Sequence, residues 1–193
     1  MIDASRSEPD DPVLEAARAT MLDFGLRKTT LTEVARRAGL SRMTVYRRYA
    51  DAPELMRALM TSEFGAVLEA AHARAAEFDD PLQRVVAEVV GTVEMLIEHP
   101  LLRRTLELEP AALGVYLTER IGEFQRAGRA TLADSIAAGQ ATGAVRAGDP
   151  ALFAEVLELI GRGPVLAALT YSEAERRAVI AELWNVIERY LAP

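Results

Sequence analysis

Hydrophobic residues recur every three or four positions through most of the chain, and this spacing predicts an all-α protein. Prolines and glycines divide the pattern into segments. Asp11, which precedes Pro12, is expected to cap the first helix, and Gly25 is expected to end it. Ser172 and Glu175 are expected to form a capping box at the start of the last helix. The helices expected from these signals cover residues 12–24, 30–38, 41–49, 52–76, 82–98, 101–108, 110–140, 151–170 and 172–191. The segment 82–98 is apolar on several sides and is expected to be buried, and the glycines and proline of 161–164 are expected to interrupt the helix that begins at 151.

Residues 30–49 predict two short helices joined by a tight turn. Thr30 is expected to cap the first helix, with the Glu33 side chain bonding back to the cap amide in a capping box. Gly39 is expected to end this helix, because a residue without a Cβ adopts the left-handed conformation at little cost. Ser41 is then the cap of the second helix. Two short helices joined in this way are typical of a DNA-binding helix-turn-helix.

The second of these helices has two distinct faces. Val45 and Tyr49 are four residues apart and are expected to face the core. The opposite face carries arginines for guanine or phosphate and methyl groups for thymine, as a helix in the major groove requires. A solvated basic helix is the alternative, but both caps, the turn glycine and the basic face fall in one register and favour DNA binding. We expect base contacts from Thr32, Arg42, Met43, Thr44 and Arg47, and phosphate contacts from Thr30, Tyr46 and Arg48.

The run from Leu31 to Ser41, followed by Thr44, Val45, Tyr46 and Tyr49, resembles the N-terminal domain of TetR-family transcriptional regulators. The chain differs from the common pattern at Ala52, where a lysine is frequent, and at Met43, where a small residue is frequent. The resemblance implies an all-helical, ligand-responsive, homodimeric repressor. It divides the chain into a loose tail at 1–11, a helix-turn-helix DNA-binding domain at 12–51, and a ligand-binding and dimerisation domain, built as a helical bundle, at 52–193.

The last two predicted helices, 151–170 and 172–191, are the expected dimer interface. By resemblance, these helices from two subunits form a four-helix bundle. The alternative is that their apolar stripes close the core of the monomer. Dimerisation has independent support, because one such head makes few base contacts and specificity usually comes from doubling them on a palindromic operator.

Charge is unevenly distributed along the chain. The net charge is −7, but residues 18–48 hold eight basic and two acidic residues, so that this segment carries +6 and the remainder −13. Binding to phosphates depends on local charge, because more distant charge is screened over about 10 Å. The distribution therefore favours double-stranded DNA as the partner of this segment.

The 193 residues include no cysteine, which excludes disulfides and thiolate metal sites. No apolar run reaches the ~20 residues that span a bilayer, and the N-terminus lacks the pattern of an export signal, so we expect no membrane partner and a cytoplasmic location.

Catalysis is not indicated. The two histidines, His72 and His99, lie on different predicted elements and outside any metal-binding spacing, and no nucleotide loop or nucleophile motif is found. We therefore expect no enzyme activity, no metal and no cofactor.

A small, hydrophobic effector is expected to bind between the helices of the C-terminal bundle. The apolar or aromatic candidates for its site are Phe64, Met95, His99, Leu102, Leu106, Tyr116 and Phe124. Core packing is the alternative role of each. The function expected is that of a repressor released by this effector. An activator or architectural DNA-binding protein, a protein-interaction module using the same basic helix, and a small-molecule-binding enzyme with a helical bundle are the other hypotheses.

Overall fold

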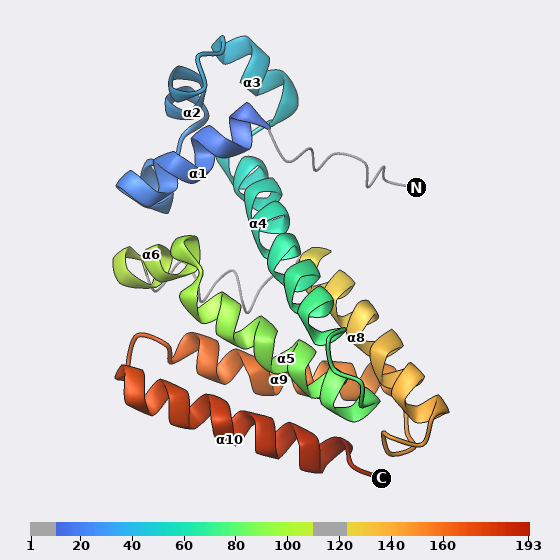
Figure 1. Cartoon of the computed structure of the whole chain (residues 1–193). Helices are drawn as coiled ribbons and strands as arrows, with labels where there is room; N and C mark the ends of the chain where they lie inside the picture. The colour runs from blue at the N-terminus through green and yellow to red at the C-terminus, as the bar shows by residue number, and fades with distance from the viewer. Residues whose placement is uncertain (1–10, 110–122) are drawn as a thin grey trace. The chain divides into compact units, whose positions relative to one another are not determined.

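The computed structural model describes residues 11–109 and 123–193. These residues form nine α-helices and one short 3-10 helix without any β-strand, which confirms the all-α prediction (Figure 1). They divide into two compact units. The first holds the described residues of Met1–Glu63 and Pro100–Gly122, and the second holds those of Phe64–His99 and Glu123–Pro193.

The first unit begins with α1 (Pro12–Phe24) and a 3-10 turn (Leu26–Lys28), followed by α2 (Leu31–Arg37), α3 (Arg42–Arg48), the start of α4 (Ala52–Ala75) and, later in the chain, α6 (Pro100–Leu108). Asp11 caps α1, since its Oδ1 accepts the Val13 amide at 3.0 Å. Gly25 ends α1 with a φ of 84°, a conformation that favours glycine. These boundaries confirm the predicted helix at 12–24.

The apolar faces of α1, α2 and α3 meet in one core, as the helix-turn-helix pattern predicts. Val13, Val34 and Val45 are completely buried there. Leu55 of α4 and Leu101 of α6 complete the same core and are also completely buried. Because α6 follows α3 by some fifty residues, its place in this core is a long-range feature that periodicity does not reveal.

Polar contacts also join α6 and the residue that follows it to α1 and the 3-10 turn. The Arg104 Nε donates to the Leu22 carbonyl at 2.9 Å, and the Arg27 amide donates to the Glu109 carboxylate at 3.0 Å. The first unit is therefore closed by a segment distant in sequence.

The second unit contains the rest of α4 with α5 (Pro81–Glu98), α8 (Glu123–Ala141), α9 (Pro150–Leu166) and α10 (Glu173–Leu191). Helix α5 packs against α8, α9 and α10, and its buried residues include Val85, Val86, Val90 and Val93. The prediction that this apolar segment is buried is confirmed.

The predicted interruption of the helix at 151–170 is wrong. Helix α9 continues through Pro164 and ends at Leu166. Gly161 is buried where α9 crosses α5, and a Cβ at this position would lie 3.0 Å from a Val93 methyl carbon. Gly161 therefore allows two helices to pack closely. Pro164 lies in the last turn of α9 and removes one backbone hydrogen bond there.

Helix starts elsewhere follow their sequence signals. Asp80 and Asp149 accept the amides of Leu82 and Ala151, each with a proline in the first turn of the helix. Ser172 and Glu175 form the complete capping box expected for α10. The helix predicted over 110–140 is observed from Glu123 to Ala141, and its first part lies outside the described residues.

Candidate nucleic-acid interface

The turn before α3 has the predicted local geometry. Gly39 has a φ of 66°, in the left-handed region. Ser41 Oγ accepts the Thr44 amide at 3.1 Å and lies 2.8 Å from the Thr44 hydroxyl. These bonds fix the start of α3 and also hold Thr44, one of the predicted base contacts.

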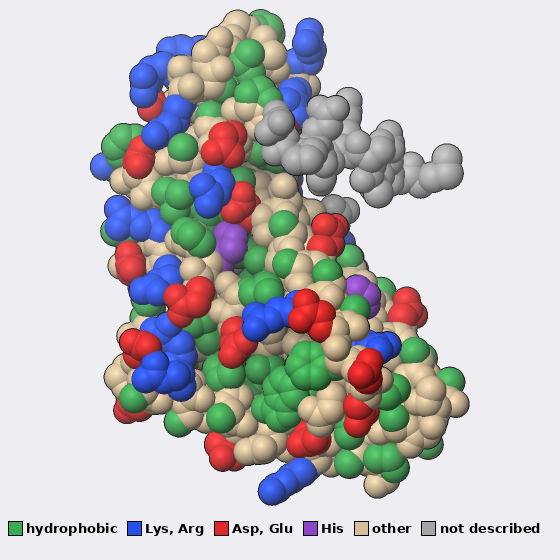
Figure 2. Space-filling model, viewed as in Figure 1, with side chains coloured by type: hydrophobic (Ala, Val, Ile, Leu, Met, Phe, Trp, Pro, Cys, Tyr) green, Lys and Arg blue, Asp and Glu red, His purple; other side chains and the backbone are tan. Residues whose placement is uncertain are grey.

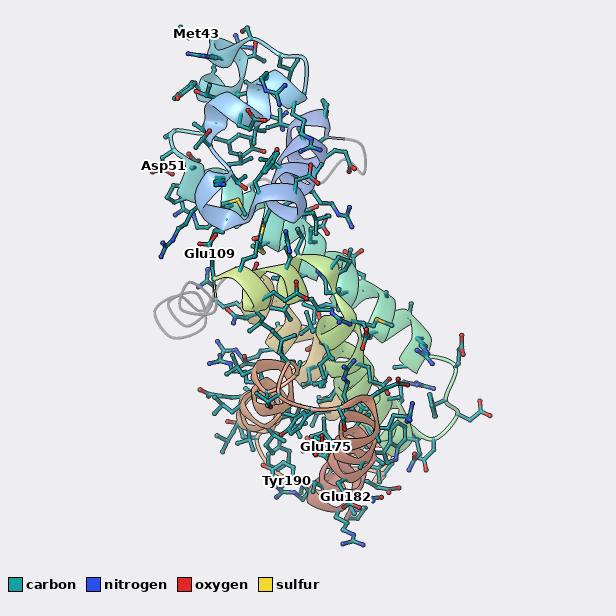
Figure 3. All side chains as sticks on the ribbon, turned by 90° about the vertical axis from the view of Figure 1, so that its left-hand side faces the viewer. Met43, Asp51, Glu109, Glu175, Glu182 and Tyr190 are labelled. Carbon is teal, nitrogen blue, oxygen red and sulfur yellow. The ribbon has the colours of Figure 1, made fainter. Side chains whose placement is uncertain are left out.

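Helix α3 has one buried side and one exposed side. Val45 is completely buried and Tyr49 is 8% exposed, whereas Met43 is 76% exposed. Figure 3 shows Met43 at the outer surface of α3. The other exposed side chains of the helix are Arg42, Tyr46, Arg47 and Arg48. The predicted contact residues on α3 therefore share an accessible surface, with Thr44 partly buried at its edge.

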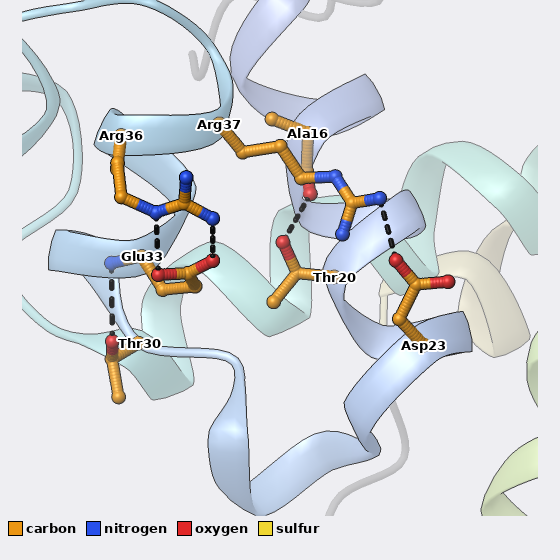
Figure 4. Close-up of polar contacts among 7 residues, drawn as sticks. All are labelled: Ala16, Thr20, Asp23, Thr30, Glu33, Arg36 and Arg37. Atoms are coloured by element: carbon orange, nitrogen blue, oxygen red, sulfur yellow. Dashed lines mark hydrogen bonds and ion pairs between the residues drawn. The ribbon is translucent and has the colours of Figure 1, made fainter.

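At the start of α2 the expected capping box is only half correct. Thr30 Oγ1 accepts the Glu33 amide at 3.2 Å, as predicted. The Glu33 carboxylate, however, takes two bonds from the Arg36 guanidinium, at 3.0 and 2.5 Å, and the Thr30 amide donates to the Lys28 carbonyl (Figure 4). These Arg36 hydrogen bonds lower the pKa of Glu33. A charged guanidinium one turn away is a stronger donor than the cap amide.

Most of the basic residues between positions 18 and 48 are neutralised within the first unit. Five form ion pairs with described residues: Arg18 with Glu63, Arg27 with Glu109, Arg36 with Glu33, Arg37 with Asp23, and Arg48 with Asp11. Lys28, Arg42 and Arg47 have no acidic partner among the residues that the structure describes. Figure 2 shows Lys and Arg side chains on the outer surface of this part of the molecule. Two of the three uncompensated charges are thus on the exposed face of α3.

Arg48 has a partner that the sequence did not indicate. Its Nη1 and Nη2 donate to Asp11 Oδ1 and Oδ2 at 2.9 and 2.5 Å, and its guanidinium lies 5.5 Å from the centre of the Tyr49 ring. The Asp11 hydrogen bonds raise the pKa of Arg48, and burial raises that of Tyr49. Asp11 was predicted only as the cap of α1, because its spacing to Arg48 carries no local signal.

The candidate effector residues fall in different parts of the structure. Phe64, Met95 and His99 belong to the second unit, where the Phe64 and His99 rings pack edge to face at 5.1 Å. Leu102 and Leu106 belong to the first unit, and Leu102 is buried. Tyr116 and the side chain of Phe124 lie outside the described residues.

An open groove of about 400 Å³ lies in the second unit between α5, α10 and the end of α4. Phe78 and Trp184 line it, and none of the candidate effector residues does.

Three further observations concern metal sites, the His72 side chain and membrane spans. Within residues 11–109 and 123–193, no three His, Asp or Glu side chains are grouped as a metal site requires. The exposed His72 side chain lies 3.2 Å from the buried Glu88 carboxylate, which also accepts a hydrogen bond from Ser135 at 2.8 Å. In the same part of the chain, no helix is both long and apolar enough to cross a membrane.

Comparison with known proteins identifies the family. Residues 13–59 match the model of the bacterial regulatory proteins of the tetR family. An uncharacterized HTH-type transcriptional regulator of Mycobacterium bovis is 33% identical over 188 residues, which cover 96% of each chain.

Solved structures show the same fold. FadR from Bacillus subtilis, in complex with stearoyl-CoA, has a TM-score of 0.70 at 15% identity, covering 93% of this chain and 98% of FadR. A TetR-family regulator from Marinobacter aquaeolei has a TM-score of 0.63 at 20% identity, covering 94% of both chains. The family resemblance of the sequence is therefore confirmed: the chain belongs to the TetR family of bacterial transcriptional regulators.

Proposed function

We propose that the protein is a dimeric repressor that binds a palindromic operator through α3 and is released by a small, hydrophobic effector. The observation that carries the DNA-binding part is the division of α3. Its inner side, Val45 and Tyr49, belongs to the core, while Arg42 and Arg47 are exposed without an acidic partner among the described residues. Exposed, uncompensated guanidinium groups on a helix of this kind suit guanine edges in the major groove.

The contact residues are proposed as follows. Thr32, Arg42, Met43, Thr44 and Arg47 contact bases, and Thr30 and Tyr46 contact phosphates. Thr32 and Thr44 are partly buried, whereas the others in this group are exposed. Two heads on successive major grooves are spaced about 34–36 Å apart, which is one helical turn of DNA.

The dimer is proposed to form through α9 and α10. Leu152, Leu159 and Leu166 recur every seven residues on α9 and remain 52%, 54% and 46% exposed. Val156 and Gly163 lie between these leucines, so that the five positions are separated alternately by four and three residues. This spacing is typical of helices that pack side by side along their length. On α10, Val186 is 50% exposed. An apolar stripe of this length is costly in water and favours a second copy as its partner.

Effector release is proposed to act through α4. This helix is continuous from Ala52 to Ala75, with Leu55 in the core of the first unit and Phe64 buried in the second. The structural neighbour FadR was solved with stearoyl-CoA, which supports a hydrophobic effector class for this chain. An effector that tilts α4 changes DNA occupancy tenfold if it favours the non-binding state by ~1.4 kcal/mol.

Selection of bound sequences from random DNA tests the proposal. The wild-type protein is expected to enrich a palindrome, and Arg42→Ala or Arg47→Ala is expected to relax the sequence at particular positions of each half-site. Arg74→Ala is the matched control, because Arg74 is an exposed arginine of α4 that lies outside both α3 and the proposed dimer helices α9 and α10. A reporter under the selected operator then distinguishes repression from activation. Failure of the wild-type protein to enrich any sequence would contradict the proposal.

A further inference from the structure

Few side chains pack α3 against the core, and its two buried ones lie on one side of the helix. The helix has seven residues, and only Val45 within it is fully buried. Tyr49, which follows it, is the second buried contact and lies one turn further along the same side. Two contacts on one line restrain translation but leave rocking about that line, which would move Arg42 and Arg47 relative to the DNA. Leu40, just before α3, adds one more packing contact, and a directional bond at the other end of the helix would restrain this rocking further.

The Asp11–Arg48 ion pair provides such a bond. It connects the last residue of α3 to the cap of α1 with two parallel hydrogen bonds, at 2.9 and 2.5 Å. A bidentate pair fixes direction as well as distance. The Asp11 side chain is only 7% exposed, and its Oδ1 also accepts the Val13 amide. The carboxylate is therefore itself held in place by the start of α1.

We propose that Asp11 and Arg48 are a positioning pair, which sets the orientation of α3 for operator recognition and keeps the charge of Arg48 from the DNA phosphates. The inference rests on the proposed DNA-binding function. It assigns Arg48 a different role from the phosphate contact expected from the sequence.

The positioning role and a direct phosphate contact have different salt signatures. Each phosphate neutralised by the protein contributes about 0.9 to the slope of log K against log salt. If Arg48 bound a phosphate, its removal would make this slope shallower by that amount per head. If Arg48 positions α3, Arg48→Ala leaves the slope unchanged and lowers affinity for the operator about tenfold, as expected for loss of a charged hydrogen bond.

Asp11→Asn separates the two roles further. Asparagine still caps α1, since Asn and Asp are comparable N-caps, but it no longer neutralises Arg48. This variant is expected to bind the operator more weakly and a scrambled duplex severalfold more tightly, with a steeper salt slope. Asp23→Asn is the matched control: it removes an equal charge from the Arg37 ion pair, which does not involve α3, and is expected to leave operator discrimination unchanged.

The experiment measures binding of full-length wild-type, Asp11→Asn, Arg48→Ala and Asp23→Asn proteins to the selected operator and to its scrambled sequence, over a series of salt concentrations. Denaturant unfolding establishes that each protein is folded, and Arg48→Lys, which keeps the charge without the planar fork, replaces Arg48→Ala if that variant unfolds. The proposal expects a reduced ratio of operator to scrambled affinity for Asp11→Asn and for the Arg48 variant.

Two results would overturn it: an unchanged ratio of operator to scrambled affinity in both variants, even where both affinities fall, or a shallower salt slope for Arg48→Ala. If the wild-type protein itself prefers no duplex, the proposed function fails as well. If the wild-type protein discriminates between the duplexes and both variants keep this discrimination, only the proposed positioning role is refuted.

Discussion

The leucine stripe of α9 allows the strength of the proposed dimer to be tested with a single truncation. Leu159 keeps 54% of its surface exposed in the single chain. Complete burial of a leucine side chain stabilises by about 1.5–3 kcal/mol, so burying the exposed part contributes about 1 kcal/mol per subunit. The residue occurs twice in a symmetric dimer. Leu159→Ala is therefore expected to weaken dimerisation by about 2 kcal/mol, which raises the dimer dissociation constant about 30-fold.

Sedimentation equilibrium over a range of protein concentrations measures this constant directly. Leu108→Ala is the matched control, because Leu108 is 45% exposed but lies on α6 in the other unit. Leu159→Glu is expected to abolish the dimer, since it places a charge in an apolar contact. A wild-type protein that stays monomeric, or equal dissociation constants for Leu159→Ala and Leu108→Ala, would refute the assignment of this face.

Three other predictions concern recognition, packing and pH. Arg47→Ala is expected to lose about 1–3 kcal/mol of discrimination at one base pair per half-site, measured by titrating operator variants; an equal loss on operator and random DNA would show that Arg47 does not read a base. Gly161→Val is expected to lower the free energy of unfolding by about 1–3 kcal/mol, because the new side chain would collide with Val93. Gly65→Ala has open space at its Cβ and is expected to stabilise α4 by up to about 1 kcal/mol. Denaturant unfolding that ranks the two variants the other way would contradict this packing. Burial raises the pKa of Tyr49, and the resulting stability is complete below the unfolded pKa of about 10 and is lost as pH rises through the folded pKa. Tyr49→Phe is therefore expected to lose less stability above pH ~10 than the wild type. Identical alkaline unfolding profiles for the two proteins would contradict this prediction.

Local signals in the sequence predicted much of the fold. The caps at Asp11, Ser41 and Ser172, and the left-handed glycines at positions 25 and 39, form their structures from neighbouring residues. Periodicity likewise identified α5 as a buried helix. These features depend on interactions within a few residues, which a sequence pattern contains.

The features that were missed depend on contacts between distant residues or on competition between partners. Leu101 enters the core of the first unit from α6, and Asp11 reaches Arg48 across 37 positions. Gly161 has a packing role that only the approach of α5 explains. The Glu33 carboxylate accepts hydrogen bonds from Arg36 and not from the cap amide, and the capping-box pattern does not include this alternative partner.

The sequence predicted which residues of α3 are exposed, but not which basic residues around it are paired with acidic ones. Periodicity correctly separated the buried Val45 from the exposed Arg42, Met43 and Arg47. It could not show that five of the eight basic residues at 18–48 have acidic partners among the described residues.

Sequence alone does not separate the candidate effector contacts from core residues. Apolar side chains that pack a core and those that line a pocket have the same spacing, as the packing of Phe64 on His99 illustrates.

The central claim is that the exposed face of α3 reads a DNA sequence. Its most direct test is the affinity of the wild-type protein for the selected operator and for a scrambled duplex of equal length, at about 0.15 M salt. The account predicts a preference of at least about 10³-fold for the operator, the lower end of the range for specific DNA-binding proteins. Equal affinity for the two duplexes would contradict it.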